Sequence, residues 1–281
     1  MSFKELGLSE PILRSLEELK HTEPSEIQQQ AIPVILAGKN LMAAAQTGTG
    51  KTGSFVLPII EMLQERAKPY SKNVHALVLT PTRELAAQVR ESVYTYGKFT
   101  STTSTAVFGG AKIFPQKSKL KKGVDVLVAT PGRLLDLVNQ KAVKLDQVQI
   151  LVLDEADHML DLGFAKDISD LVDKIPGRRQ TLFFSATINP TIKKQAYQMV
   201  GSGAIRIQVS PKDPVSKNVD HQMVFVEMDD KRFFLQRLLQ ENSDKKFLVF
   251  VRTKVRAERL KKAMERADID TLTIHGDKEQ D

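Results

Sequence analysis

Seven short apolar runs recur along residues 1–209, separated by segments in which apolar residues return at helical spacing. Most of the runs are apolar at nearly every position, which is typical of strands buried on both faces of a parallel sheet. Residues 83–97 and 131–140 have the spacing of amphipathic helices. Alternating strands and helices predict an α/β domain with a mainly parallel sheet. The predicted strands are Asn40–Ala44, Ala76–Leu79, Thr105–Phe108, Asp125–Ala129, Gln149–Leu153, Thr181–Phe184 and Ile205–Val209.

A break in this pattern at residues 210–217 predicts a linker between two domains. Two prolines, Pro211 and Pro214, stand there among alternating charges. Strand and helix signals then resume, but residues 218–281 offer only three candidate strands, fewer than a parallel α/β domain usually has. We therefore expect a first domain at residues 1–209 and a partial second domain at residues 218–281. The candidate elements of the second domain are Gln222–Val226, Lys231–Gln240, Phe247–Val251, Lys254–Arg266 and Thr271–Ile274.

Composition narrows the class of protein without identifying a partner. The chain has 41% hydrophobic and 27% charged residues, an ordinary globular composition, and it contains no cysteine. Disulfides and thiolate zinc sites are therefore excluded. No apolar run approaches the roughly 18 residues of a membrane helix, and the first residues lack the apolar stretch of a signal peptide. We therefore expect a soluble, cytoplasmic protein. The net charge of +7 fits a nucleic-acid partner, but a soluble protein of another kind can be equally basic.

Six polar or glycine-rich segments directly follow the ends of predicted strands. In an open parallel sheet, ligands bind outside the carboxyl ends of the strands, so these segments should meet at one edge. Chance would scatter such segments over both edges, and we therefore interpret this edge as the working face. In chain order the segments are Ala45–Thr52, Thr80–Leu85, Gly109–Gly110, Thr130–Arg133, Asp154–Asp157 and Ser185–Thr187.

The segment after the first strand is the most specific of the six. Gly50, Lys51 and Thr52 stand between a strand and a helix, which is typical of a phosphate-binding turn. Backbone N–H groups and the helix N-terminus would face the phosphate oxygens. Lys51 would reach the β- and γ-phosphates, and the Thr52 hydroxyl would ligate magnesium. The general pattern has glycine where this chain has Ala45, and an ordinary strand-to-helix turn is the alternative interpretation.

Acidic and basic side chains complete the candidate chemistry. Asp154 would hold magnesium opposite the phosphate loop, and Glu155 could orient or deprotonate the attacking water. A simple helix N-cap is the alternative for this pair. Arg83 and Arg133 each open a helix after a Thr-Pro segment, where they could bind a phosphate backbone. The alternative is that each arginine is only a solvent-exposed side chain at the start of a helix that begins with proline, because that sequence pattern is the same.

Taken together, these segments resemble the DEAD-box RNA helicases, especially the small bacterial type. Asp154, Glu155, Ala156 and Asp157 spell the motif that names the family, and Ala45 is also the family's residue at the start of the phosphate loop. The resemblance implies an α/β fold in which a RecA-like parallel-sheet domain is followed by an incomplete second RecA-like domain. It also implies ATP and Mg²⁺ as ligands, and RNA bound through its backbone without sequence preference.

The resemblance assigns roles to residues of the first domain. An adenine-reading segment at residues 1–29 would use Phe3 to stack on the base and Gln28 to read its edge, ahead of an ATP-binding core at residues 30–209. Lys20–His21 and Glu26 depart from the family's usual residues in that segment. The implied catalytic residues are Lys51, Asp154, Glu155, Ser185 and Thr187, the last two coupling hydrolysis to strand separation. The phosphate loop is Ala45, Gln46, Thr47, Gly48, Thr49, Gly50, Lys51 and Thr52, and the RNA contacts are Pro81, Thr82, Arg83, Gly109, Gly110, Thr130, Gly132 and Arg133.

The predicted function is that of an ATP-dependent RNA helicase core, which unwinds short RNA duplexes. Phe250–Thr253 and His275–Asp277 resemble motifs of the second domain, but the family's later segments, which supply arginine fingers, are not in these 281 residues. The chain is therefore expected to hydrolyse ATP slowly on its own. A nucleotide- and RNA-binding module without activity is one alternative. A DNA helicase or translocase is another, and the Gln28 segment and the Asp154–Asp157 spelling disfavour it.

Overall fold

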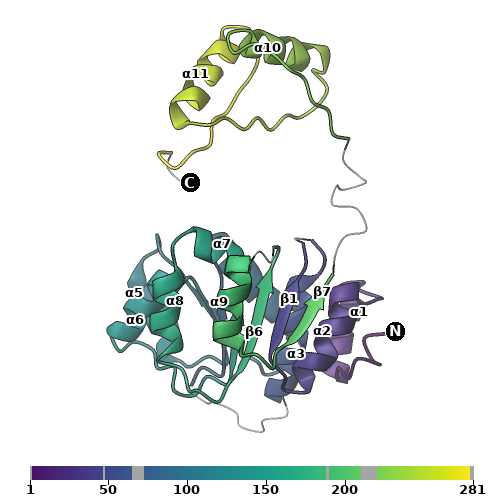
Figure 1. Cartoon of the computed structure of the whole chain (residues 1–281), viewed down its shortest axis with the longest axis vertical. Helices are drawn as coiled ribbons and strands as arrows, with labels where there is room; N and C mark the ends of the chain where they lie inside the picture. Colours follow the sequence, from purple (N-terminus) through teal and green to yellow (C-terminus); the bar gives the residue numbers. More distant parts are fainter. Residues whose placement is uncertain (1, 47, 65–72, 188–189, 210–219, 279–281) are drawn as a thin grey trace. The chain divides into compact units, whose positions relative to one another are not determined.

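The computed structural model of the chain divides into two compact units, Met1–Pro214 and Val215–Asp281 (Figure 1). The structure describes residues 2–46, 48–64, 73–187, 190–209 and 220–278. The division between the units falls inside the linker predicted at residues 210–217, which itself lies outside the described residues.

Seven strands form one sheet in the first unit, in the order β3-β4-β2-β5-β6-β1-β7. All neighbouring strands are parallel, so the carboxyl ends of all seven lie at the same edge (Figure 1). The α/β prediction is confirmed, and each observed strand end lies within one residue of its predicted position. The strands are β1 Leu41–Ala44, β2 Ala76–Leu79, β3 Ser104–Val107, β4 Val126–Ala129, β5 Ile150–Leu153, β6 Gln180–Ser185 and β7 Ile205–Gln208.

Helices cover both faces of this sheet. Helices α1 to α4 pack on one face around the first hydrophobic core, and α5 to α9 pack on the other face around the second core (Figure 1). The bounds of these helices are α1 Glu10–Glu18, α2 Glu26–Leu36, α3 Lys51–Gln64, α4 Arg83–Tyr96, α5 Ile113–Lys121, α6 Pro131–Asn139, α7 Ala156–Asp161, α8 Ala165–Val172 and α9 Pro190–Val200. Across the described ranges of both units, no helix combines the length and apolarity that a membrane span requires.

The interior strands join the two cores because successive strand residues point to opposite faces. In β2, Ala76 and Val78 enter the first core, whereas Leu77 and Leu79 enter the second. Strands β1, β2, β4, β5 and β6 are buried at every position. Strands β3 and β7 are only partly buried, because they lie at the two edges of the sheet. Burial on both faces explains why the interior strands read as unbroken apolar runs.

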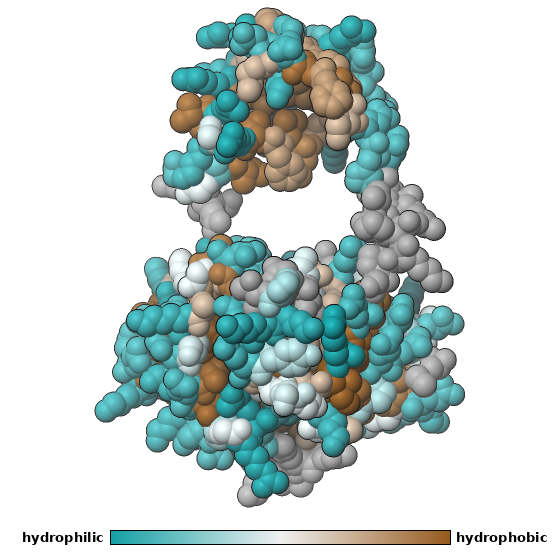
Figure 2. All heavy atoms as spheres, viewed as in Figure 1, coloured by the Kyte–Doolittle hydropathy of each residue, from teal (hydrophilic) through white to brown (hydrophobic). Residues whose placement is uncertain are grey.

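The second unit contains helices α10 at Lys231–Glu241 and α11 at Lys254–Glu265, in agreement with the sequence. The three strands predicted there are wrong for this structure, because no residue between 220 and 278 is assigned to a strand. The apolar patterns at 222–226, 247–251 and 271–274 fit strands, but a strand also needs a hydrogen-bonded neighbour, and the described residues provide none. Their apolar side chains are consequently exposed, and Figure 2 shows them gathered in this unit.

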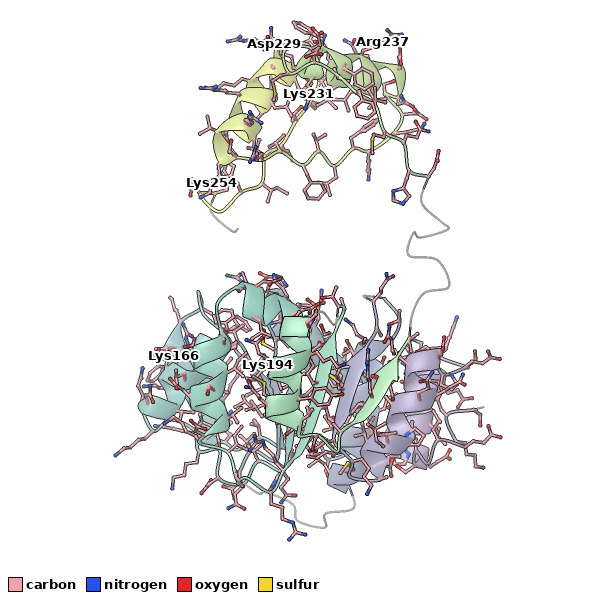
Figure 3. The ribbon with its side chains drawn as sticks, in the orientation of Figure 1. Lys166, Lys194, Asp229, Lys231, Arg237 and Lys254 are labelled. Carbon is pink, nitrogen blue, oxygen red and sulfur yellow. The ribbon has the colours of Figure 1, made fainter. Side chains whose placement is uncertain are left out.

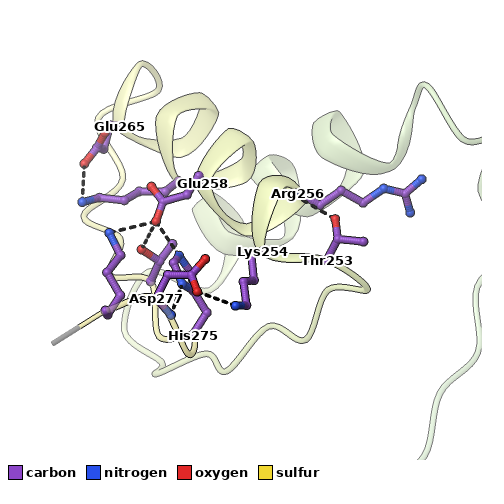
Figure 4. A network of polar contacts seen from close by, with 10 residues as sticks. Thr253, Lys254, Arg256, Glu258, Glu265, His275 and Asp277 are labelled. Carbon is purple, nitrogen blue, oxygen red and sulfur yellow. Dashed lines mark hydrogen bonds and ion pairs between the residues drawn. The ribbon is translucent and has the colours of Figure 1, made fainter. Parts of the chain in front are cut away.

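Polar contacts tie the end of the second unit to α11 (Figure 4). The Glu258 carboxylate accepts a hydrogen bond from the Thr273 hydroxyl at 2.9 Å and contacts His275 Nε2 at 2.8 Å and Lys278 Nζ at 2.9 Å. Hydrogen bonds from Lys278, His275 and Thr273 lower the pKa of Glu258 to about 2. In the same view, Lys254 pairs with Asp277.

In the first unit, the exposed lysines Lys166 and Lys194 lie on the outer surfaces of α8 and α9 (Figure 3).

Candidate nucleotide and nucleic-acid site

The six segments that follow predicted strands do lie at one edge of one sheet. Strands β1 to β6 are parallel, and each is followed at its carboxyl end by one of these segments. Backbone hydrogen bonds extend the strand pairing into the loops. The Ala45 N–H donates to the Ser185 carbonyl at 3.1 Å, and the Asp154 N–H donates to the Leu79 carbonyl at 2.9 Å. The loops are therefore held in register with the strands that carry them.

The phosphate loop runs from the end of β1 into α3. Gly48 and Gly50 have φ values of +81° and +92°, a left-handed backbone that residues with a side chain rarely adopt. The Thr49 hydroxyl closes the turn by donating to the Gln46 carbonyl at 2.7 Å. Ala45 is buried at the start of the loop, and Thr52 is partly buried in the first turn of α3. The remaining loop residue, Thr47, lies outside the described residues.

Gln28 packs directly on this loop. Its amide nitrogen donates to the Gly50 carbonyl at 3.2 Å, and its amide oxygen accepts from the Ser25 N–H at 2.9 Å. A Cβ on Gly50 would lie only 2.7 Å from Ser25 Oγ and 2.9 Å from Gln28 Nε2. The glycine is thus required both by its φ and by the close approach of the Gln28 segment. An amide can donate two hydrogen bonds and accept two, so within the described residues one donor and one acceptor of Gln28 have no hydrogen-bond partner.

Lys51 and Asp154 are the most buried charged residues of the site. Lys51 is 6% exposed and Asp154 is 4% exposed. Lys51 Nζ and Asp154 Oδ1 each lack a hydrogen-bond partner among the described residues. A buried polar atom without a partner is costly and uncommon in native proteins. An ammonium group and a carboxylate oxygen left open in this way suit a ligand that brings anionic oxygens and a cation.

The electrostatics of Asp154 support this interpretation. The pKa of Asp154 is raised to about 6, mainly by burial and also by the negative charges of Glu155 and Asp157, while the positive charge of Lys51 and a backbone hydrogen bond from Glu155 act in the opposite direction. A cation beside Asp154 would favour its charged form. Within the described residues, no three His, Asp or Glu side chains form a metal-binding cluster by themselves. Mg²⁺ is usually held by one or two carboxylates together with substrate phosphates, a mode that Asp154 and Thr52 fit.

Glu155 has an unusual backbone. It is the N-cap of α7 and has φ 51° and ψ 49°, in the left-handed region. The other non-glycine residues with positive φ in the described structure follow the ends of helices, where this conformation is common, as Lys20, Lys141 and Asp268 do. Strain of this kind costs about 1–3 kcal/mol and clusters at functional sites. The Glu155 side chain is partly buried, and its carboxylate lies 3.6 Å from His158 Nδ1.

Asp157, in the first turn of α7, is bonded to the loop after β6. Its Oδ2 accepts hydrogen bonds from the Thr187 N–H and from the Thr187 hydroxyl, both at 2.9 Å. The Ser185 hydroxyl donates to the Thr187 carbonyl. Burial alone would raise the pKa of Asp157, but the hydrogen bonds from Thr187, Ser185 and His158 outweigh it and lower the pKa. The acidic segment after β5 is therefore coupled to the segment after β6.

The residues expected to bind a nucleic-acid backbone form a second group at this edge. Arg133 Nη1 donates to the Ala111 carbonyl at 3.1 Å, and a Cβ on Gly110 would lie 3.4 Å from Arg83 Nη1. Arg83 is exposed and Arg133 is partly buried. Thr82 caps α4 by accepting from the Leu85 N–H at 3.2 Å, and Thr130 is the N-cap of α6. The remaining members of this group are Pro81, which is buried, Gly109, which is exposed, and Gly132, which is partly buried.

Phe3 is placed differently from the other predicted ligand residues. It is 5% exposed and belongs to the first hydrophobic core. In this arrangement the ring offers little surface to a base, and its role against adenine stays a prediction.

The sequence predicted no role in the site for two residues, Asp157 and Ser25. Asp157 is the last residue of the Asp154–Asp157 motif, but the motif does not predict its bonds to Thr187, because residues 157 and 187 are far apart in the chain. Ser25 lines the approach to Gly50, and its Oγ is buried without a hydrogen-bond partner among the described residues. The Ser-x-x-Gln spacing of Ser25 and Gln28 is the signal that could have marked this helix start.

Comparison with known proteins agrees with this geometry. Residues 25–195 match the family model described as DEAD/DEAH box helicase. Among curated proteins, the DEAD-box ATP-dependent RNA helicase RhpA of Helicobacter pylori is 38% identical over 279 residues, covering 99% of this chain and 56% of RhpA. The ATP-dependent RNA helicase CshA of Limosilactobacillus reuteri is 40% identical over 281 residues, covering 100% of this chain and 56% of CshA. The chain thus spans about half the length of these relatives.

A solved structure is also similar. The crystal structure of a DEAD box protein from the hyperthermophile Methanococcus jannaschii aligns with a TM-score of 0.70 and 34% sequence identity, covering 99% of this chain and 74% of that chain.

Proposed function

Because this chain belongs to the DEAD/DEAH box helicase family, we propose that it is the core of an ATP-dependent RNA helicase that binds ATP with Mg²⁺ and single-stranded RNA. The observation that carries the proposal is the pair of buried, unpartnered atoms Lys51 Nζ and Asp154 Oδ1 beside the glycine-rich turn. Triphosphate oxygens would satisfy the ammonium group. Magnesium, when bound, would neutralise the developing phosphate charge and satisfy the carboxylate.

The phosphate loop would hold ATP through its backbone. Gly48 and Gly50, with their left-handed backbone, and the N-terminus of α3 would offer N–H groups to the phosphate oxygens. Lys51 would contact the β- and γ-phosphates, and Thr52 and Asp154 would be the protein's magnesium ligands. Gln28, whose amide has a donor and an acceptor left over in the described part of the chain, would read the adenine edge. Competition between ATP and GTP tests this assignment, and equal affinities would contradict it.

Glu155 would act on the attacking water. The Glu155 side chain is 18% exposed, whereas Asp154 is 4% exposed, so the neighbouring carboxylates would serve different partners. The charged form would orient the water and accept a proton from it. Proton transfer of this kind typically contributes about 10²–10⁴-fold to a rate.

RNA would lie over the second group of loop residues. Arg83 and Arg133, the exposed glycines and the helix starts after Thr82 and Thr130 offer contacts to phosphate and sugar. Contacts of this type position a strand without reading its sequence, so binding should be largely independent of sequence and should weaken steeply with salt. A strong preference for one RNA sequence at fixed length would contradict this part of the proposal.

The contacts among Asp157, Ser185 and Thr187 would couple the two functions. They join the loop that carries Asp154 and Glu155 to the loop after β6. A shift of either loop on nucleotide binding would therefore be transmitted to the other.

A nucleotide- and RNA-binding module without turnover is the second candidate. It is favoured by the second unit, whose described residues form two helices but no strand and leave many apolar side chains exposed. Steady-state ATPase activity of the 281-residue chain, with saturating single-stranded RNA, with DNA of the same sequence and with neither, separates the candidates. Turnover stimulated by RNA supports the helicase core, and equal stimulation by DNA would instead support a DNA-dependent enzyme. Nucleotide binding without turnover supports the binding module.

A further inference from the structure

Phe114, in the first turn of α5, is the most exposed large apolar side chain among the described residues of the first unit. It is 80% exposed, compared with 61% for Tyr94 and 51% for Leu162. Its neighbours on the helix explain why it does not enter the core. Gln116 and Leu120 are buried and Ile113 packs against the second core, so the buried side of α5 is already occupied. Phe114 shares the opposite face with Ser118 and Lys121, at helical spacings of four and seven residues.

The backbone that carries Phe114 is firmly held. Gln116 Oε1 accepts from the Phe108 N–H at 3.2 Å, and Gln116 Nε2 donates to the Phe108 carbonyl at 3.1 Å. This pair of bonds fixes the start of α5 to the residue that follows β3. Because this helix start is anchored, the backbone at Phe114 has a defined place, four residues after Gly110 in the chain.

That place borders the residues proposed to bind the RNA backbone. The loop between Phe108 and Phe114 contains Gly110, which approaches Arg83, and Ala111, whose carbonyl accepts from Arg133. Lys112 is exposed just before α5, and Lys117 and Lys121 follow on the helix. An aromatic ring among cations, beside a backbone-binding surface, has the composition of a nucleic-acid stacking site.

We propose that Phe114 stacks on a base of the bound single-stranded RNA, next to the nucleotides whose phosphates contact Arg83 and Arg133. The inference rests on the proposed RNA binding and adds to it a contact with a base. Every base has a π-face, so stacking here would add affinity without adding sequence preference. The lysines of this segment would contact the flanking phosphates and give the contact its dependence on salt.

The absence of tryptophan from the chain makes a direct optical test possible. Phe114→Trp would place a single indole at the proposed contact, and Tyr94→Trp would place one at an exposed position on α4. Position 94 lies roughly 16 Å along that helix from Arg83. Short single-stranded oligoadenylate should quench the fluorescence of Phe114→Trp and leave that of Tyr94→Trp nearly unchanged. An oligonucleotide of the same length with abasic sites should quench neither variant.

Binding measurements with Phe114→Ala complete the test. The substitution should weaken oligoadenylate binding by about 10-fold, the value of one stacked base, and leave binding of the abasic strand unchanged. If the substitution weakened the affinity for oligoadenylate and for the abasic strand equally, or weakened neither, the stacking contact would be wrong. The proposed RNA binding would not be contradicted by that result. Failure of the unchanged chain to bind any RNA would overturn both this inference and the proposed function.

Discussion

The carboxylate of Asp157 accepts two hydrogen bonds from Thr187, one from its backbone N–H and one from its hydroxyl. Asp157 lies in the first turn of α7, which follows β5, and Thr187 lies in the loop after the neighbouring strand β6. A single carboxylate oxygen therefore links the start of α7, directly after Asp154 and Glu155, to the loop after β6. This relationship depends on the charge of Asp157, and its strength can be measured through the pKa of that carboxyl group.

Thr187→Val should raise the pKa of Asp157 toward its ordinary value. The substitution keeps the shape of the side chain but removes the hydroxyl bond, while the backbone bond remains. Because the pKa of Asp157 is lowered in the native state, the contribution of this group to stability is present at neutral pH and is lost as pH falls through the folded-state pKa. The variant should therefore lose stability at neutral pH and show less further loss in acid. NMR titration of the Asp157 carboxyl carbon in both proteins measures the effect, and an unchanged pKa would show that the hydroxyl bond is unimportant.

Asp154 should behave in the opposite way. Its folded-state pKa of about 6 lies above the unfolded value, so the metal-free protein should lose stability as pH rises from about 4 to about 6 and then level off. The expected loss is on the order of 3 kcal/mol, from a shift of about two pKa units. Asp154→Asn should remove this pH dependence, stabilise the metal-free protein at pH 7 and abolish magnesium-dependent ATP binding. Denaturant unfolding between pH 4 and 7 in a chelator tests the prediction, with the exposed Asp146→Asn as control.

The first domain could be predicted closely because its strands are buried on both faces and are bounded by glycine, proline and polar turns. The apolar runs of β2 and β5 contain no competing polar residue, and the parallel arrangement then places every loop at one edge. The second unit could not be predicted from the same signals. The run Phe247–Val251 has strand composition, but pairing depends on a neighbouring strand that a local pattern does not reveal.

The candidate site was predictable where chemistry is local and not where it depends on distant contacts. Lys51 and Thr52 follow from the turn in which they stand. The burial of Phe3 and the bonds between Asp157 and Thr187 depend on how distant segments pack. The left-handed backbone of Glu155 had no sequence signal either, because glycine or asparagine is the usual residue in that conformation.

Gly50→Ala should abolish or severely weaken ATP binding. The new methyl group would meet Ser25 Oγ at 2.7 Å and Gln28 Nε2 at 2.9 Å, in addition to the strain of a φ of +92°. Gly38→Ala is the matched control, because Gly38 also has a positive φ but has no atom within 4 Å of the added Cβ. The control should lose about 1 kcal/mol of stability and retain its nucleotide affinity. Competition binding and thermal unfolding of both variants separate the steric clash at Gly50 from the backbone strain that both positions share. Equal nucleotide affinities of the two variants would contradict the predicted clash.

Arg133→Ala should weaken RNA binding uniformly across sequences and reduce the salt slope of the affinity by about one unit. The guanidinium group is held in place by the Ala111 carbonyl, so the phosphate contact is partly pre-organised. Arg133→Lys keeps the charge but not the forked geometry, and it should recover the salt slope but only part of the affinity. The measurement is the dissociation constant for two unrelated single strands at several salt concentrations. A loss confined to one sequence would mean that Arg133 contacts a base.

The backbone conformation of Glu155 should lower the stability of the protein, while its carboxylate is required for ATP hydrolysis. Glu155→Gln keeps the size of the side chain and the left-handed backbone, so it should leave stability nearly unchanged, retain ATP binding and remove hydrolysis. Glu155→Gly and Glu155→Ala both remove the carboxylate, but only glycine relieves the backbone strain of φ 51°. Glu155→Gly should therefore be more stable than Glu155→Ala by about 1 kcal/mol, with both proteins inactive. Chemical denaturation gives the stability difference, and ATPase assays with RNA give the activity. If the glycine and alanine variants unfold at the same denaturant concentration, the backbone of Glu155 is not strained, and its conformation does not lower the stability of the protein.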